Sequence, residues 1–133
     1  MPKEQYVSYD VAKLLKEKGF DWGCCSYWCI FPNDDRVHTD YGHFANYNVS
    51  ETDRFVSRPT QQMACRWLRK EHNIHIMPTI GCDVDRTPRI FYGAMIASFN
   101  DSGDISYHDP LDENGYDEPE DAIEAALDYV LKI

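Results

Sequence analysis

The chain has 133 residues, of which 43% are hydrophobic and 14% aromatic, a composition too apolar for an intrinsically disordered protein. Its length fits one domain, so we expect a single domain over residues 1–133 that needs no disulfide or structural metal to fold. The formal net charge of −10, from 13 basic and 23 acidic residues, disfavours direct binding to nucleic acids and to anionic membranes.

The negative charge is concentrated at the C-terminal end of the chain. Residues 101–133 contain eleven acidic residues and one basic residue, whereas residues 1–100 contain twelve of each. No apolar run approaches the roughly 20 residues of a membrane span, and the polar N-terminus shows no secretory signal. An odd number of cysteines, five, favours free thiols, and we therefore expect a cytoplasmic protein.

The first half of the chain predicts one helix and a hairpin. The helix is expected to begin at the N-cap Ser8 and to end at Gly19, after which Phe20 and Trp22 should fold back onto the core. An aromatic-rich strand is expected at residues 26–31. Turn residues at 33–35 lead to a partner strand at residues 37–44, and the polar stretch 45–58 predicts an irregular connection.

A second helix is predicted from Pro59 to Glu71, because proline suits a first helical turn and apolar residues follow at helical spacing. Trp67 and Leu68 are its expected core contacts, and His72-Asn73 should end it.

Two strands and a third helix are predicted in the second half, with a further short strand at residues 104–108. Residues 74–80 alternate but contain Pro78, which predicts an edge or bulged strand. Residues 89–99 are apolar on both faces and predict a central strand, after a turn at residues 83–88. The third helix is expected to open at Asp117 in a capping box with Glu120, followed by a wide apolar stripe.

The order α-β-β-α-β-β-(β)-α predicts an α+β fold. We expect a small antiparallel sheet of four or five strands with about three helices packed mainly on one face.

Two clusters suggest metal binding. Cys24, Cys25 and Cys29 lack the spaced pairs of a structural zinc site, so buried thiols are the favoured interpretation. The acidic segment 109–121 resembles a calcium-binding loop, but Pro110 occupies the first ligand position, and an Asn-Gly turn before a helix explains the same residues. We therefore expect no metal and no cofactor.

No catalytic residue is assigned from the sequence. The chain contains neither a G-x-S-x-G motif nor a glycine-rich phosphate loop. Asp83 and Asp85 are expected in a hydrated turn, where carboxylates are a poor acid–base pair. A site assembled from distant residues would still make the chain a small enzyme.

A basic strip is the candidate binding site. Arg66, Arg69 and Lys70 lie on one predicted helical face, with Arg54 and Arg58 just upstream and no acidic residue between positions 54 and 70. The candidate binding residues are Arg58, Arg66, Arg69 and Lys70. They form either a solvated face, paired with the acidic segment of this chain or of a second copy, or a docking face for an acidic partner or phosphate.

Two segments carry a resemblance to known proteins. Residues 6–20 (YVSYDVAKLLKEKGF) and 59–76 (PTQQMACRWLRKEHNIHI) resemble short uncharacterised proteins of Bacteroidales-type gut bacteria and their phages or mobile elements. Those proteins also end in an acidic, alanine-rich helix, as residues 118–133 are expected to do. The resemblance implies a cytoplasmic, phage-related setting and carries over no activity, cofactor or site residue.

Three hypotheses for function follow. The leading one is a non-catalytic accessory or protein-interaction module that binds a protein partner or a second copy of itself. The alternatives are an acidic decoy that occupies a DNA-binding protein, and a small enzyme or metal-binding protein.

Overall fold

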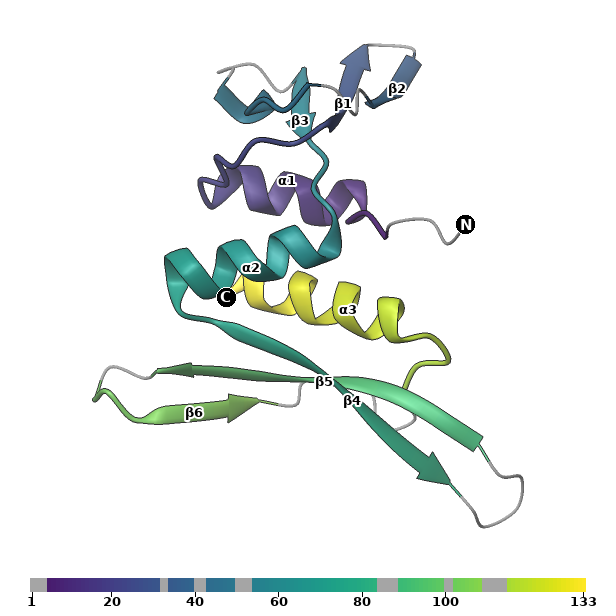
Figure 1. The fold of residues 1–133 in the computed structure, drawn as a ribbon, viewed down its shortest axis with the longest axis vertical. Helices are drawn as coiled ribbons and strands as arrows, with labels where there is room; N and C mark the ends of the chain where they lie inside the picture. Colours follow the sequence, from purple (N-terminus) through teal and green to yellow (C-terminus); the bar gives the residue numbers. More distant parts are fainter. Residues whose placement is uncertain are drawn as a thin grey trace. The chain divides into compact units, whose positions relative to one another are not determined.

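The computed structural model describes residues 5–31, 34–39, 43–49, 54–83, 89–99, 102–108 and 115–133. These residues form three α-helices, one 3-10 helix and six strands in two antiparallel sheets (Figure 1). The α+β class and the order of elements are confirmed, but the strands form two three-stranded sheets instead of one. The chain divides into two compact units, residues 1–67 and 68–133. A single domain over residues 1–133 stays a prediction.

Helix α1 (Tyr9–Glu17) forms as the sequence predicts. Ser8 is the N-cap, and its Oγ accepts a hydrogen bond from the Val11 amide at 3.2 Å, which satisfies one of the free amides of the first turn. Val11, Ala12 and Leu15 are buried, and Gly19, with φ of +92°, follows the C-cap. Phe20 is buried as expected.

The first sheet has the strand order β2-β1-β3, with β1 (Ser26–Phe31) at its centre. β2 (Asp34–Thr39) begins three residues earlier than predicted, because pairing with β1 continues through the Asx residues expected to form the turn. β3 (Phe55–Ser57) lies in the stretch predicted to be irregular, where a 3-10 helix, η1 (Tyr47–Val49), also forms. A three-residue strand is too short to show alternation, so only its pairing with β1 reveals it.

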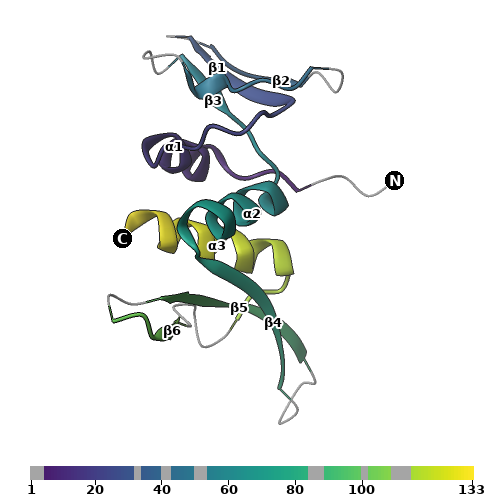
Figure 2. The same cartoon turned by 60° about the vertical axis from the view of Figure 1, so that its left-hand side comes forward.

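Helix α1 packs on one face of this sheet (Figures 1 and 2). The ring of Tyr9 meets the ring of Trp28 edge to face, with 5.5 Å between centroids. Lys16 also donates a hydrogen bond from Nζ to the Phe55 carbonyl at 2.8 Å. These contacts join α1 to both the central strand and β3.

Helix α2 (Gln61–His72) follows β3. Thr60 Oγ1 accepts a hydrogen bond from the Met63 amide at 3.1 Å, and Asn73, with φ of 54°, lies just after the last helical residue. The predicted core contacts Trp67 and Leu68 are each 2% exposed. Helix α2 therefore begins two residues after Pro59 and ends where the sequence predicts.

The second sheet has the strand order β4-β5-β6. β4 (His75–Asp83) is an edge strand, which confirms the prediction made from Pro78. β5 (Arg89–Phe99) is central, as predicted, and pairs with both β4 and β6 (Ile105–His108). The predicted turn residues 84–88 lie outside the described part of the chain.

Helix α3 (Pro119–Lys132) covers one face of this second sheet (Figures 1 and 2). Its buried residues are Ala122, Ala126, Leu127, Val130 and Leu131, which confirms the predicted apolar stripe. The expected capping box is wrong, because Glu118 is the N-cap and makes no side-chain cap hydrogen bond. The Asp117 carboxylate instead accepts a hydrogen bond from Arg89 Nη2 at 3.1 Å. No helix in the described ranges is long and apolar enough to cross a membrane.

Candidate functional site

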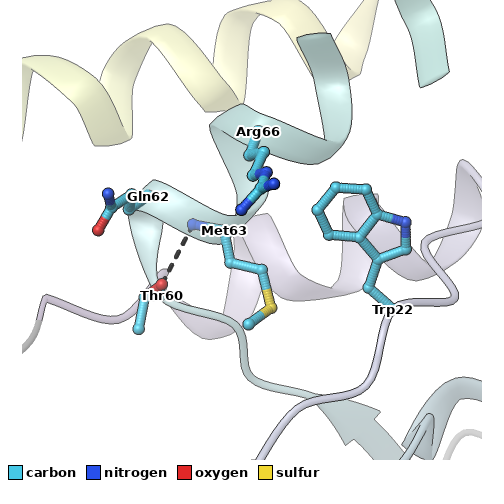
Figure 3. A pocket seen from close by; sticks show the side chains of 5 residues that line it. All are labelled: Trp22, Thr60, Gln62, Met63 and Arg66. Atoms are coloured by element: carbon cyan, nitrogen blue, oxygen red, sulfur yellow. Dashed lines mark hydrogen bonds between the residues drawn. The ribbon is translucent and has the colours of Figure 1, made fainter. Parts of the chain in front are cut away.

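A hollow of about 340 Å³ opens beside the N-terminal half of α2. It is lined by Trp22, Thr60, Gln62, Met63 and Arg66. Figure 3 shows the side chains of Met63 and Arg66 extending from α2 on the side where Trp22 lies. The hollow therefore combines an aromatic ring and a thioether with a guanidinium group, and all five lining residues belong to the unit formed by residues 1–67.

Local packing explains why these groups meet. Met63 and Arg66 are three residues apart, so they lie about one turn apart on the same side of α2. Trp22 lies two residues after Phe20, whose buried ring packs edge to face against the buried ring of Trp67, with 5.3 Å between centroids. This contact fixes the segment after α1 against α2 and leaves Trp22 half-buried at the surface.

The thiol of Cys24 lies behind the Met63 wall. Its Sγ is 3.8 Å from Met63 Sδ, and the residue is 1% exposed. Burial raises the pKa of the Cys24 thiol to about 12, a charge on neighbouring Cys25 would raise it further, and a hydrogen bond with Ser57 lowers it. Cys24 therefore stays protonated at neutral pH, and a thiol is a poor nucleophile and a poor metal ligand.

Three cations of the predicted basic strip are exposed on α2: Arg66, Arg69 and Lys70. No described residue forms a hydrogen bond or an ion pair with any of these three side chains. Pairing with the acidic segment of the same chain, which is one form of the solvated-face interpretation, is therefore not found among the described residues. Of the three, Arg66 alone lines the hollow.

Arg58 differs from these three residues because it is held inside its own unit. Its guanidinium carbon lies 4.1 Å from the centroid of the Tyr6 ring and 5.4 Å from that of Trp28. Its Nη1 donates to Ser26 Oγ at 3.3 Å, and its buried Nε has no hydrogen-bond partner in the described ranges. Stacking of this kind is worth about 2 kcal/mol when the cation is desolvated. Arg58 thus joins the N-terminal segment to β1 and does not extend the exposed strip.

The metal and catalytic candidates of the sequence fall partly outside the described residues. Within the described ranges, no three His, Cys, Asp or Glu side chains are grouped as metal ligands. Residues 109–114 of the calcium-like segment, and Asp85 of the carboxylate pair, lie outside those ranges.

Sequence reasoning missed four of the five residues that line the hollow, all but Arg66. Trp22 was expected in the core, and Met63 was placed beside the core-facing side of α2. The three-residue spacing of Met63 and Arg66 could have suggested their proximity, whereas the position of Trp22 depends on the long-range contact between Phe20 and Trp67.

Comparisons with known proteins add no relative: no family model, no curated protein and no solved structure matches this chain.

Proposed function

We propose that this chain is a non-catalytic protein-interaction module that binds an acidic segment of a partner protein at the hollow on α2. One observation carries the proposal. Arg66 is an exposed cation that forms no ion pair with any described residue, and it lines a hollow together with Trp22 and Met63.

The chemistry of the hollow suits a carboxylate next to an apolar group. A guanidinium offers a fork of N–H donors that matches the two oxygens of a carboxylate. Trp22 and Met63 provide apolar contact area, and tryptophan, methionine and arginine are enriched in the cores of protein interfaces. Arg69 and Lys70, exposed on the same helix, would accelerate the approach of an acidic partner.

The residues lining the hollow support binding over catalysis. None of them carries a carboxylate, an imidazole or a thiol, the usual general bases and nucleophiles. The Thr60 hydroxyl oxygen already accepts a hydrogen bond from the Met63 amide. A phosphate group of the partner would also pair with Arg66. Identifying the partner's group that contacts Arg66 distinguishes a carboxylate from a phosphate.

The acidic-decoy alternative receives less support. A decoy needs free carboxylates over a continuous face, yet Asp117 is paired with Arg89 and Asp128 with Lys132, at 3.1 and 2.9 Å. The proposed phage-related setting rests on the sequence resemblance alone, and the proposed cytoplasmic location rests on the resemblance and on the odd number of cysteines.

Co-purification from the native host tests the proposal. Tagged wild-type protein should retain a partner that is lost in Arg66→Glu and reduced in Trp22→Ala. Lys13→Glu is the matched control, since Lys13 is an exposed cation on α1 whose nearest ring, that of Tyr9, is 5.6 Å away. Retention of the same partners by Arg66→Glu would contradict the proposal, as would turnover of a general panel of ester, phosphoester or nucleotide substrates.

A further inference from the structure

Strand β5 is apolar on both faces, a pattern typical of a strand that is buried on both sides. Side chains alternate between the two faces of a strand, and Ala94 and Ile96 of β5 are buried on the face that α3 covers. No described element of residues 68–133 covers the opposite face, which we call the open sheet face (Figures 1 and 2). The expectation that both faces of β5 are buried is thus wrong for this face within a single chain.

The open sheet face carries a hollow and a bulky apolar side chain next to each other. The hollow has a volume of about 250 Å³, and the small Ala97 lines it together with the larger Met77 of β4 and Ile105 of β6. Phe99 follows Ala97 by two residues, so it lies on the same face, where it lines the hollow and is 53% exposed. The face thus offers both a depression for one bulky apolar side chain and a side chain of that kind.

The charges on this face favour no charged partner. None of its described side chains is a carboxylate. Arg89, at one end of the face, is paired with Asp117, and His75, at the other end, shares a hydrogen bond with Asn73, with 3.1 Å between Nε2 and Oδ1. The occupant is therefore selected by apolar surface and by shape.

A second copy of the chain matches this face in shape. In a twofold dimer the same surface of both copies meets itself, so Phe99 of each copy would enter the hollow beside Ala97 of the other. The packing of one sheet on another is also one of the stable layer arrangements, and it would cover the second apolar face of β5.

The net charge of −10 on each copy does not prevent this contact. Helix α3 and its acidic side chains lie on the other side of the sheet. Sheets that pack face to face are about 10 Å apart, so the two α3 helices would be separated by both sheets, further than the Debye length of about 8 Å at physiological ionic strength. Their repulsion is therefore largely screened, and it weakens further as the salt concentration rises.

We infer that the chain forms a weak twofold dimer through the open sheet face, with Phe99 of each copy in the hollow of the other. The nine residue pairs of β4 and β5 extend over about 30 Å, and the three strands span about 10 Å. The footprint of about 300 Å² per copy is well below the roughly 800 Å² per partner of a stable interface, so the dissociation constant should be micromolar or weaker. This inference is independent of the proposed function, because no residue of the hollow on α2 takes part.

Sedimentation equilibrium of the full chain from about 1 to about 500 µM tests the inference. The wild type should show a monomer–dimer equilibrium. Phe99→Ser removes the inserted ring and Ala97→Phe fills the hollow, so each should weaken the dimer at least about tenfold. Ile80→Ser is the matched control, because Ile80 is 69% exposed on the other face of the same hairpin and its loss should leave the dimer unchanged. Arg66→Glu should also leave it unchanged.

Two further measurements test the reciprocal contact and its apolar character. An equal mixture of Phe99→Ser and Ala97→Phe should dimerise more strongly than either variant alone, because one of its two contacts joins an intact ring to an intact hollow. Raising the NaCl concentration from about 0.05 to about 0.5 M should strengthen the wild-type dimer, since salt screens the repulsion between two acidic chains.

Four results would overturn the inference. The first is a wild-type chain that stays monomeric at about 500 µM. The second is unchanged dimerisation in Phe99→Ser or in Ala97→Phe, and the third is a mixture of the two that dimerises no better than its components. The fourth is a dimer that salt weakens and Arg66→Glu dissociates, since this would assign the association to the basic strip of one copy and the acidic segment of the other. Far-UV circular dichroism and urea unfolding check that each variant folds.

Discussion

The ring of Phe91 gives the sharpest test of the second sheet, because it lies against two glycines. A Cβ at Gly81 or at Gly115 would clash with this ring, and Gly115 also has φ of +69°. Gly103 has φ of +82° but no atom within 4 Å of an added Cβ. Gly81→Ala therefore tests the ring contact alone, Gly103→Ala tests the backbone strain alone, and Gly115→Ala tests both together.

The expected magnitudes follow from these two effects. A residue with a Cβ in the left-handed region costs about 1–2 kcal/mol, which is the whole cost expected for Gly103→Ala. Displacing a packed ring costs about 1–3 kcal/mol, and at Gly81 the gain from replacing a strand glycine offsets about 0.5–1 kcal/mol of it. Gly115→Ala combines both effects and should destabilise by roughly 2–5 kcal/mol.

Urea unfolding followed by circular dichroism measures these differences. In a Phe91→Ala background, the cost of Gly115→Ala should fall to that of Gly103→Ala, and Gly81→Ala should cost nothing. If Gly115→Ala is no more destabilising than Gly103→Ala in the wild-type background, the placement of Phe91 against Gly115 is wrong.

Three further predictions concern the cysteines and the N-cap of α1. Since burial raises the pKa of the Cys24 thiol to about 12, the folded protein keeps a proton that the unfolded chain releases. The Cys24 thiol therefore leaves the free energy of unfolding unchanged below about pH 9. Between about pH 9 and about pH 12 it lowers the free energy of unfolding by about 1.4 kcal/mol per pH unit. Urea unfolding of Cys24→Ala should lack this part of the alkaline decline, and an equal decline in both proteins would contradict it. Ser8→Ala should cost about 1 kcal/mol in the same assay through the lost N-cap bond; no change would refute the capping role. A thiol reagent should modify exposed Cys82 in the folded protein but buried Cys24 and Cys29 only on unfolding, and rapid loss of all free thiols would argue against that burial.

Sequence patterns predicted the elements that local chemistry specifies. Ser8 marks the start of α1, Pro78 places β4 at an edge, and the apolar stripe of α3 faces its sheet. Each of these features depends on residues that are close together in the chain, so it can be predicted from the sequence alone.

Features that depend on distant contacts were not predictable. β3 is recognised only through the pairing of Val56 with Trp28, and the division into two sheets depends on which strands meet. Asp117 has the spacing of a capping residue, but its carboxylate pairs with Arg89, 28 positions away in the sequence.

The candidate site shows the same limit. Helical spacing was enough to place Arg66, Arg69 and Lys70 on α2, but it could not show that Arg58 stacks on Tyr6 and Trp28. Nor could it show that Trp22 lies beside Arg66, because that proximity depends on ring packing between Phe20 and Trp67.

The hollow beside α2 is proposed to receive an acidic segment of a partner protein. A photo-crosslinking amino acid at Gln62, an exposed residue that lines the hollow, tests it directly in the native host. We expect a covalent adduct from position 62, with the attachment point in an acidic stretch of the partner, and no such adduct from the same amino acid at Lys13. Arg66→Glu should abolish the adduct. An adduct from position 62 that persists in Arg66→Glu, or one attached to a basic or wholly apolar stretch, would contradict it.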